Sequence, residues 1–312
     1  QEMMIAAQLD WTVSKRPGYT ITTPEYGDNG MELMQTPSSF FIVRDTDNSI
    51  LSHCGPKYLP VQNEKIFQFF SDFTTAAQMT METAGSLRGG KSIWALAKLA
   101  DTFELPGEDQ IGGYLLLHQP HEAGHALTAR YTQIRVVCNN TLQLAFSNGK
   151  AQFSMSHIRE FNADMAQQAA ETLGLANDTS KLFKESAEFL AKKKAKHSNV
   201  LEFIGRIYQP DVIAQRVKND ELRAEGRKVG EEGPLIDEFN RTTRNVVDAL
   251  ERAPGALLKS SAGTWWGALN AVTYVEDHMR GGENKVYNSL IGDGSKRKEK
   301  AYRMALEYAE AA

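Results

Sequence analysis

Residues 79–99 read MTMETAGSLRGGKSIWALAKL. The two ends of this stretch alternate between apolar and polar side chains, which is the pattern of a half-buried β-strand. Between them lies Arg88-Gly89-Gly90-Lys91, and adjacent glycines favour a tight turn because they tolerate positive φ. The stretch therefore predicts a β-hairpin. In its second strand, alternation places Ile93, Ala95 and Ala97 on one face and Trp94, Leu96 and Lys98 on the other.

Similar patterns continue on both sides of this hairpin. The turn residues 45–48 lie between two short apolar runs, and an amphipathic pattern with a possible N-cap at Asn63 follows them. The predicted elements are strands over 40–43, 50–53, 79–87, 92–99, 114–118, 126–137 and 153–156, with helices over 64–76 and 139–147. Together they predict a curled antiparallel sheet with a core helix.

From Asn162 the apolar residues recur at helical spacing instead. The expected helices span 162–173, 179–195, 198–206, 210–220, 234–252, 263–279 and 296–311. The chain is therefore expected to be an α+β protein with a strand-rich N-terminal half and a helical C-terminal half. Its expected parts are an irregular N-terminal arm (1–37), a strand-rich α+β core (38–160) and a helical region (161–312).

Composition narrows the class of protein. Hydrophobic residues make up 41% of the 312 residues and charged residues 24%, so a globular core can form. No apolar run approaches the roughly 20 residues that cross a bilayer, so no membrane association is expected. Two cysteines, Cys54 and Cys138, are typical of a reduced protein in the cytoplasm of the host cell rather than a disulfide scaffold. The net charge of −4 does not by itself indicate a nucleic-acid binder.

One pentapeptide matches a zinc motif. His121-Glu122-Ala123-Gly124-His125 fits H-E-x-x-H, in which two histidines one helical turn apart bind zinc and the glutamate activates water. The motif requires a helix, yet this string lies between two strand patterns, which favours a polar hairpin loop. A zinc hydrolase remains a third hypothesis. We expect no metal site, no catalytic residues and no cofactor.

A second string imitates a phosphate-binding loop. Gly85, Gly90, Lys91 and Ser92 satisfy G-x-x-x-x-G-K-[ST], but a strand is predicted after Ser92, where the phosphates need a helix N-terminus. The alternatives are a basic hairpin tip, at which glycines allow close approach to a ligand, and a merely solvated turn.

Cations and aromatic residues are interleaved along the predicted strands. Cations that follow a phosphate backbone, together with aromatic rings that stack on bases, are what single-stranded nucleic acid requires. The alternative, in which the aromatics are core and the charges form the solvated face of a sheet, stays open. The candidate DNA-binding residues are Lys57, Tyr58, Arg88, Lys91, Trp94, Lys98, Arg130 and Arg135.

Several segments in order along the chain resemble a known family. They are FFIVRD (40–45), KYLPVQN (57–63), ETAGSLRGGK (82–91), RVVCNNTL (135–142) and GTWWGALNAVT (263–273). These are similar to landmarks of the phage/plasmid-like proteins, which are catalogued as a domain of unknown function. The resemblance implies a mobile genetic element, and it implies a variable hairpin loop at 119–125.

A second resemblance concerns topology alone. The helix over 64–76, the strands after it and the helix over 139–147 are similar to the β-β-β-α core of single-strand annealing recombinases, which form rings or arcs on DNA. The leading hypothesis is therefore a non-enzymatic homo-oligomer that binds single-stranded DNA and promotes annealing in phage or plasmid recombination. The alternatives are an accessory or anti-defence protein that binds a host protein, and a zinc hydrolase acting through His121, Glu122 and His125.

Overall fold

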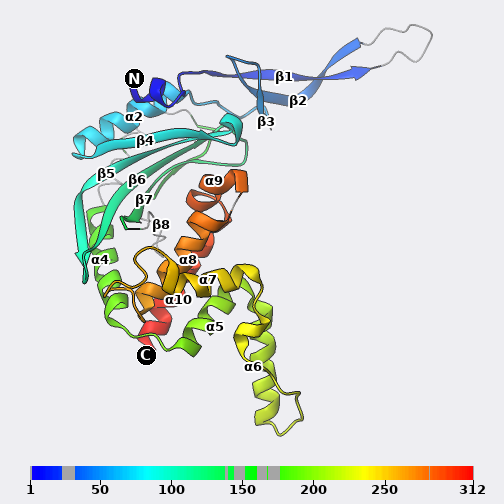
Figure 1. The fold of residues 1–312 in the computed structure, drawn as a ribbon. Helices are drawn as coiled ribbons and strands as arrows, with labels where there is room; N and C mark the ends of the chain where they lie inside the picture. Colours follow the sequence, from blue (N-terminus) through cyan, green and yellow to red (C-terminus); the bar gives the residue numbers. More distant parts are fainter. Residues whose placement is uncertain are drawn as a thin grey trace. The chain divides into compact units, whose positions relative to one another are not determined.

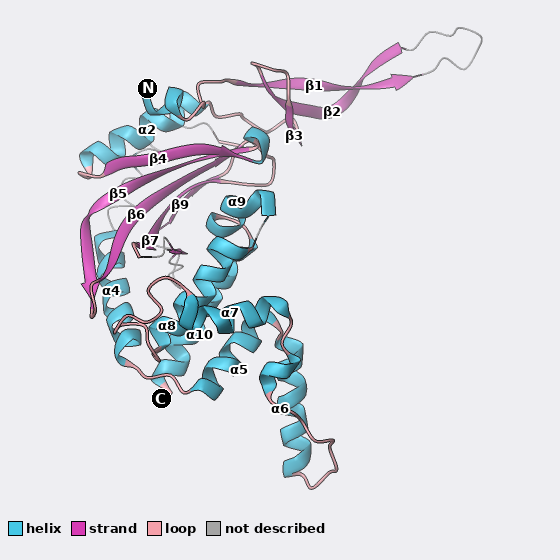
Figure 2. Cartoon of the chain, viewed as in Figure 1, coloured by secondary structure: helices cyan, strands magenta, loops and turns pink. Residues whose placement is uncertain are grey.

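A computed structural model describes residues 2–22, 32–137, 140–143, 152–159, 167, 176–280 and 282–311. Sheets lie in the first half of the chain and most helices in the second, which confirms the predicted α+β class (Figure 1, Figure 2). The chain forms two compact units that interleave along the sequence. Unit 1 comprises residues 1–100, 114–131 and 148–176, and unit 2 comprises 101–113, 132–147 and 177–312.

The first sheet of unit 1 has the order β1-β2-β3, with β1 spanning Val13–Thr22, β2 Glu32–Arg44 and β3 Ile50–Cys54. Its β2–β3 hairpin confirms the one predicted around residues 45–48. The expectation of an irregular arm over 1–37 was wrong, because its described part forms α1 (Glu2–Ala6), β1 and the start of β2. Pro and Gly residues in this segment hide the alternation that would identify β1 as a strand. The strand forms because it pairs with β2.

The second sheet contains the hairpin predicted over residues 79–99. β4 (Thr80–Leu87) and β5 (Ser92–Leu105) are antiparallel and joined by a turn at Arg88–Gly90, in which Gly89 and Gly90 adopt positive φ. The order continues through β6 (Asp109–Pro120), β7 (Leu127–Arg135) and β8 (Asn140–Gln143), and β9 (Gln152–Met155) also pairs with β7.

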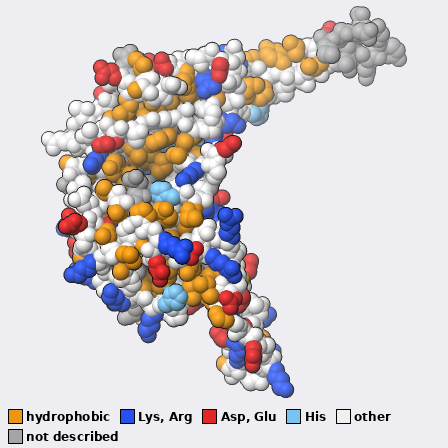
Figure 3. Space-filling view, viewed as in Figure 1, with side chains coloured by type: hydrophobic (Ala, Val, Ile, Leu, Met, Phe, Trp, Pro, Cys, Tyr) orange, Lys and Arg blue, Asp and Glu red, His pale blue; other side chains and the backbone are white. Residues whose placement is uncertain are grey.

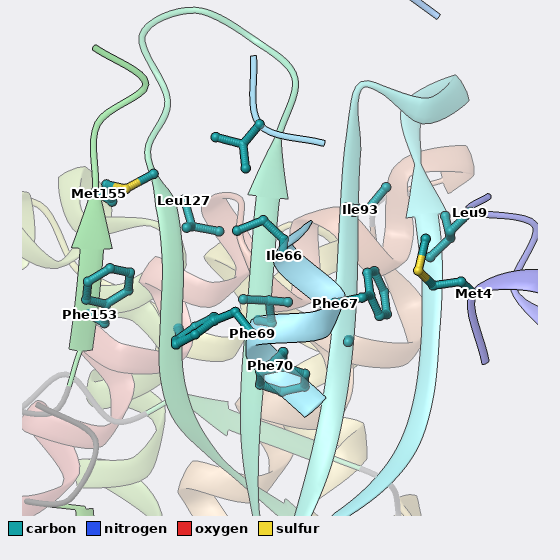
Figure 4. Close-up of a cluster of buried hydrophobic side chains, with 14 of the residues drawn as sticks. Met4, Leu9, Ile66, Phe67, Phe69, Phe70, Ile93, Leu127, Phe153 and Met155 are labelled. Carbon is teal, nitrogen blue, oxygen red and sulfur yellow. The ribbon is translucent and has the colours of Figure 1, made fainter. Parts of the chain in front are cut away.

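Helix α2 (Asn63–Ala76) covers one face of this sheet. Its residues Ile66, Phe67, Phe69 and Phe70 are buried against alternate residues of the strands, including Ile93, Leu127 and Phe153 (Figure 4). Asn63 is the first helical residue rather than the N-cap, and its side-chain amide donates to the carbonyls of Leu9 and Trp11.

The helix predicted over 139–147 was wrong in its described part. Residues 140–143 form strand β8, which pairs with Thr132–Arg135 of β7. The local sequence suits a helix start at Asn139 or Asn140, but the free edge of β7 offers backbone partners to an extended segment. Residues 144–150 lie outside the described residues, as do Cys138 and, apart from Gln167, the helix predicted over 162–173.

Unit 2 is mainly helical. Its elements are α4 (Ala176–Lys192), α5 (His197–Tyr208), α6 (Pro210–Ala224), a 3₁₀ turn (Leu235–Glu238), α7 (Arg241–Arg252), α8 (Trp265–Tyr274), a π-helical segment (Val275–Met279), α9 (Lys285–Leu290) and α10 (Asp293–Glu310). Its core surrounds Trp265, Trp266 and Phe203. Among the described residues, no helix combines the length and apolar character needed to cross a membrane.

Candidate nucleic-acid interface

The second sheet has a second face within unit 1, on the side away from α2. Ile93, Leu115 and Ala129 belong to the core under α2, so the residues next to them in each strand point to the opposite side. That second face carries Trp94, Leu96 and Lys98 of β5, Tyr114, Leu116 and His118 of β6, and Thr128 and Arg130 of β7. Five of them, Trp94, Lys98, Tyr114, Thr128 and Arg130, are half-buried and so retain accessible surface.

Trp94 lies across a glycine on the neighbouring strand. Gly85 of β4 pairs directly with Trp94, and a Cβ on Gly85 would lie 3.2 Å from the indole Nε1. The absence of a side chain at Gly85 therefore leaves room for the ring to lie against the sheet. A half-buried indole supported in this way can offer part of its ring to a base.

The charge on this part of the sheet is one-sided. Within unit 1, the central strand segments 92–100, 114–120 and 127–131 contain Lys98 and Arg130 but no Asp or Glu. The whole chain, in contrast, has more acidic than basic residues. In the space-filling view, hydrophobic side chains gather over the strands of this sheet, with both basic and acidic side chains around them (Figure 3).

The β4–β5 turn and the β6–β7 loop meet at one end of the sheet. The backbone N–H of His121 donates to the carbonyl of Lys91 at 2.8 Å, and Arg88 forms an ion pair with Glu122. Arg88 is therefore half-buried and internally paired rather than a solvated tip residue, whereas Lys91 is exposed. The turn keeps the basic character expected of it, but only Lys91 presents that charge fully to solvent.

The zinc-motif residues lie in this loop and not on a helix. Residues 121–126 form turns between β6 and β7, which confirms the predicted hairpin loop. His121 is fully buried, with Nε2 2.9 Å from Asn63 Oδ1, whereas His125 is exposed. In the described residues, no group of three or more His, Cys, Asp or Glu could hold a metal ion. The geometry that H-E-x-x-H chemistry requires is therefore missing.

Two buried histidines lie at this loop: His118 near the end of β6 and His121 at the start of the loop. Burial lowers the pKa of His118 to about 3, and the positive charge of Arg130 adds to this effect. Burial also lowers the pKa of His121 to about 3, with a smaller contribution from His157. Both imidazoles are therefore neutral at pH 7, and the cationic character of this region comes from the arginine and lysine side chains.

These histidines predict acid-sensitive folding. In the unfolded chain they titrate near 6.5, so between pH 6.5 and about 3 the unfolded state binds protons that the folded state does not. The free energy of unfolding should fall as pH falls, by up to about 1.4 kcal/mol per pH unit for each histidine. Urea unfolding at pH 7.5, 6.5, 5.5 and 5.0 measures this slope. A His118→Gln/His121→Gln variant should lose less stability per pH unit, and equal slopes for the two proteins would contradict the assignment.

Besides Lys91, which lies in the turn, and Arg135, three of the predicted DNA-binding residues lie off the second face. Tyr58 is buried and stacks on His157 with ring centroids 4.8 Å apart, so its ring is not available to a base. Lys57 is exposed, but it lies in the loop after β3. Arg88 is held by Glu122.

Arg135 requires the largest correction, because it is buried in unit 2. Its Nε and Nη2 donate to the two oxygens of Asp109 at 2.7 and 2.8 Å, and Nη2 also reaches Ser261 and the carbonyl of Gly255. Asp109 is fully buried and accepts further bonds from Ser260 and Trp266. This guanidinium supports the fold and cannot contact a phosphate. Its position at the end of a predicted strand gave no sign of a buried carboxylate 26 residues earlier.

The structure places Trp94, Lys98 and Arg130 of the predicted set on one sheet face, together with Tyr114, and leaves Lys91 in the turn before β5. Alternation along β5, β6 and β7 could have grouped the residues of the face from the sequence, because each is an even-numbered step from another residue of the same face. The roles of Gly85 and Glu122 could not have been found in this way, since each depends on a neighbouring segment.

Comparisons with known proteins identify the family but no activity. No curated protein and no solved structure matches the chain. A family model described as a domain of unknown function, DUF932, matches residues 50–306 and so includes the second sheet, α2 and nearly all of the helical unit. The chain belongs to the DUF932 family.

Proposed function

We propose that this protein binds single-stranded DNA on the second face of its β4–β7 sheet and promotes annealing without bond chemistry. The observation that carries the proposal is the acid-free group of Trp94, Lys98, Tyr114 and Arg130 on one sheet face. Cations neutralise phosphates, and aromatic rings stack on any base, so such a face binds a strand without reading its sequence. Lys91 extends the positive charge at the turn.

The biological setting is part of the same proposal. Resemblance to the phage/plasmid-like proteins supports a role in recombination on a mobile element, where complementary single strands must be held extended with their bases accessible. The annealing step forms only base pairs, so it needs no catalytic residue. We place the protein in the cytoplasm of the host cell, where such DNA is found.

The electrostatic half of the proposal is tested with Lys98→Ala/Arg130→Ala. Fluorescence anisotropy with a labelled 30-nucleotide oligothymidine, repeated from 50 to 300 mM salt, measures affinity and its salt dependence. Each phosphate contact on a single strand contributes roughly 0.7 to the slope of log affinity against log salt. The variant removes two cations, so the magnitude of this slope should fall by about 1.4. Lys65→Ala is the matched control, because Lys65 is an exposed cation on α2, which covers the other face.

The aromatic half separates stacking from charge. Trp94→Ala should weaken binding roughly 5- to 150-fold while leaving the salt slope unchanged, since a stacked base contributes about 1–3 kcal/mol without releasing counterions. Trp94→Phe should retain most of the affinity. Unchanged affinity in the alanine variant, with its melting temperature preserved, would exclude this face. No oligothymidine binding by the parent protein would reject the function and favour the host-protein alternative.

A further inference from the structure

The first sheet continues past its third strand as a two-stranded ribbon. β3 pairs only with Phe40–Val43 of β2, while residues 19–22 of β1 pair with residues 32–35 of β2. No described third strand covers this distal part (Figure 1). Two strands alone are marginally stable in water, so a ribbon of this kind gains from a partner surface.

One face of the ribbon is apolar. Ile21 lies opposite Leu33, and Tyr19 shares their face because it is two residues from Ile21; the fourth residue of this face is Gln35, the partner of Tyr19. The exposed fractions of Tyr19, Ile21 and Leu33 are 53%, 61% and 72%. The opposite face carries Thr20, Thr22, Glu32 and Met34. Only the first face therefore presents three large apolar side chains in a row.

The same unit contains a pocket with a partly apolar lining. It has a volume of about 440 Å³ and lies among α1, the segment before β1, α2 and β4. Its apolar lining consists of Met3, Met4, Ile5, Trp11, Phe67 and Met81, and polar residues line the rest, namely Asp10, Thr12, Gln62, Asn63, Glu64, Gln68 and Ser71. Methionine side chains adapt their shape to what they contact, so this lining can accommodate aliphatic and aromatic side chains.

The ribbon cannot fill this pocket in its own chain. Thr12 lines the pocket, and Tyr19 lies seven residues further along an extended segment. At about 3.3 Å per strand residue, the ring is roughly 23 Å along the strand from Thr12, and Ile21 is further still. The apolar ribbon face and the pocket therefore cannot meet within one molecule, but the ribbon face of one molecule can meet the pocket of another.

We propose that the apolar ribbon face of one copy docks into the α1–α2 pocket of a second copy. The contact is head-to-tail, because each copy uses its ribbon on one neighbour and its pocket on another. Repetition of such a contact builds a ring if the rotation closes and a filament if it does not. This assembly does not depend on nucleic-acid binding, and it is tested in the absence of DNA.

Light scattering coupled to size exclusion tests the ribbon. The parent chain should have at least twice its monomer mass of 34.7 kDa. Tyr19→Ser/Ile21→Ser/Leu33→Ser should run as a monomer with an unchanged melting temperature, because these side chains are exposed. The matched variant Thr20→Ser/Thr22→Ser/Met34→Ser alters the other face and should keep the parent mass.

A mixing experiment tests the pocket. Ile5→Glu/Met81→Gln changes an exposed and a half-buried lining residue and should also be monomeric. Mixed with the ribbon variant, it supplies an intact ribbon to an intact pocket, so the pair should form a 1:1 dimer. A monomeric parent at every concentration, a ribbon variant of parental mass, or a mixture that stays monomeric would each overturn the proposal.

Discussion

Replacing Asp109 with alanine is expected to cost about 3–5 kcal/mol of the free energy of unfolding, because it leaves a buried guanidinium without its counter-ion. Asp109 and Arg135 have exposed fractions of 0% and 3%. The carboxylate accepts from Arg135, Ser260 and Trp266, so its removal leaves several buried donors without an acceptor. Typical domains are stable by only about 5–15 kcal/mol, so this loss should lower the urea midpoint markedly.

Two variants resolve the source of this effect. Asp109→Asn keeps the shape, but Arg135, Ser260 and Trp266 all donate to Asp109, so an amide N–H of the asparagine must face a donor. The asparagine variant should therefore lose a substantial part of the free energy of unfolding, though less than the alanine variant loses. Lys296→Ala removes an exposed ion pair with Asp293 in the same unit and should change nothing measurable.

The same experiment decides the role of Arg135. Arg135→Ala should destabilise the fold to a similar degree, and a double variant with Asp109→Ala should lose less than the sum of the two. If Arg135→Ala instead kept the parent urea midpoint and lost only DNA binding, the phosphate contact predicted from the sequence would be correct and the buried pair would be wrong.

The substitution Gly267→Ala is expected to lower the free energy of unfolding by about 2–3 kcal/mol. This is the opposite of the usual effect, because alanine usually stabilises a helix by about 1 kcal/mol relative to glycine. Gly267 lies in the first turn of α8, and a Cβ there would lie 2.0 Å from the carbonyl oxygen of Ser261. That carbonyl accepts from the backbone and side chain of Thr264, so it cannot move away without breaking these bonds. The clash must displace the start of α8, whose Trp265 and Trp266 are core residues.

Gly230→Ala is the matched control for this substitution. Gly230 is exposed, has no positive φ and has no atom within 4 Å of an added Cβ. Thermal melting of the two variants should separate them clearly. A Gly267→Ala protein as stable as the parent would show that α8 and the segment before it can shift apart.

Both predictions concern segments on which the expected resemblance to the phage/plasmid-like proteins rests. RVVCNNTL contains Arg135, and GTWWGALNAVT contains Thr264, Trp265, Trp266 and Gly267. In the structure, these residues fill the core of unit 2 or bond inside it. These parts of the resemblance therefore identify a fold more directly than a binding surface.

Local patterns were sufficient for much of the fold. The alternation over 79–99, the Gly-Gly turn and the amphipathic residues 64–76 each depend on neighbours in the sequence, and each predicted element is present. The same alternation separated Trp94 and Lys98 from Ile93 and Ala95. Period-two patterning identifies a face wherever one side of a strand is buried.

Other features depended on segments distant in the chain. β1 is stabilised by pairing with β2, and residues 140–143 extend along β7 instead of forming a helix. Local propensity is weaker than an available backbone partner, so neither could be deduced from the local sequence.

The sequence by itself determined the α+β class, the central hairpin and the residues that are candidates for DNA binding. Only the tertiary structure decided how far each cation is buried. Lys98 and Arg130 are half-buried on the sheet, Arg88 forms an ion pair with Glu122, and Arg135 is buried against Asp109. The identity of a residue as arginine does not reveal whether its side chain faces water or a buried carboxylate. Its role depends on burial and on the partner that the fold places beside it.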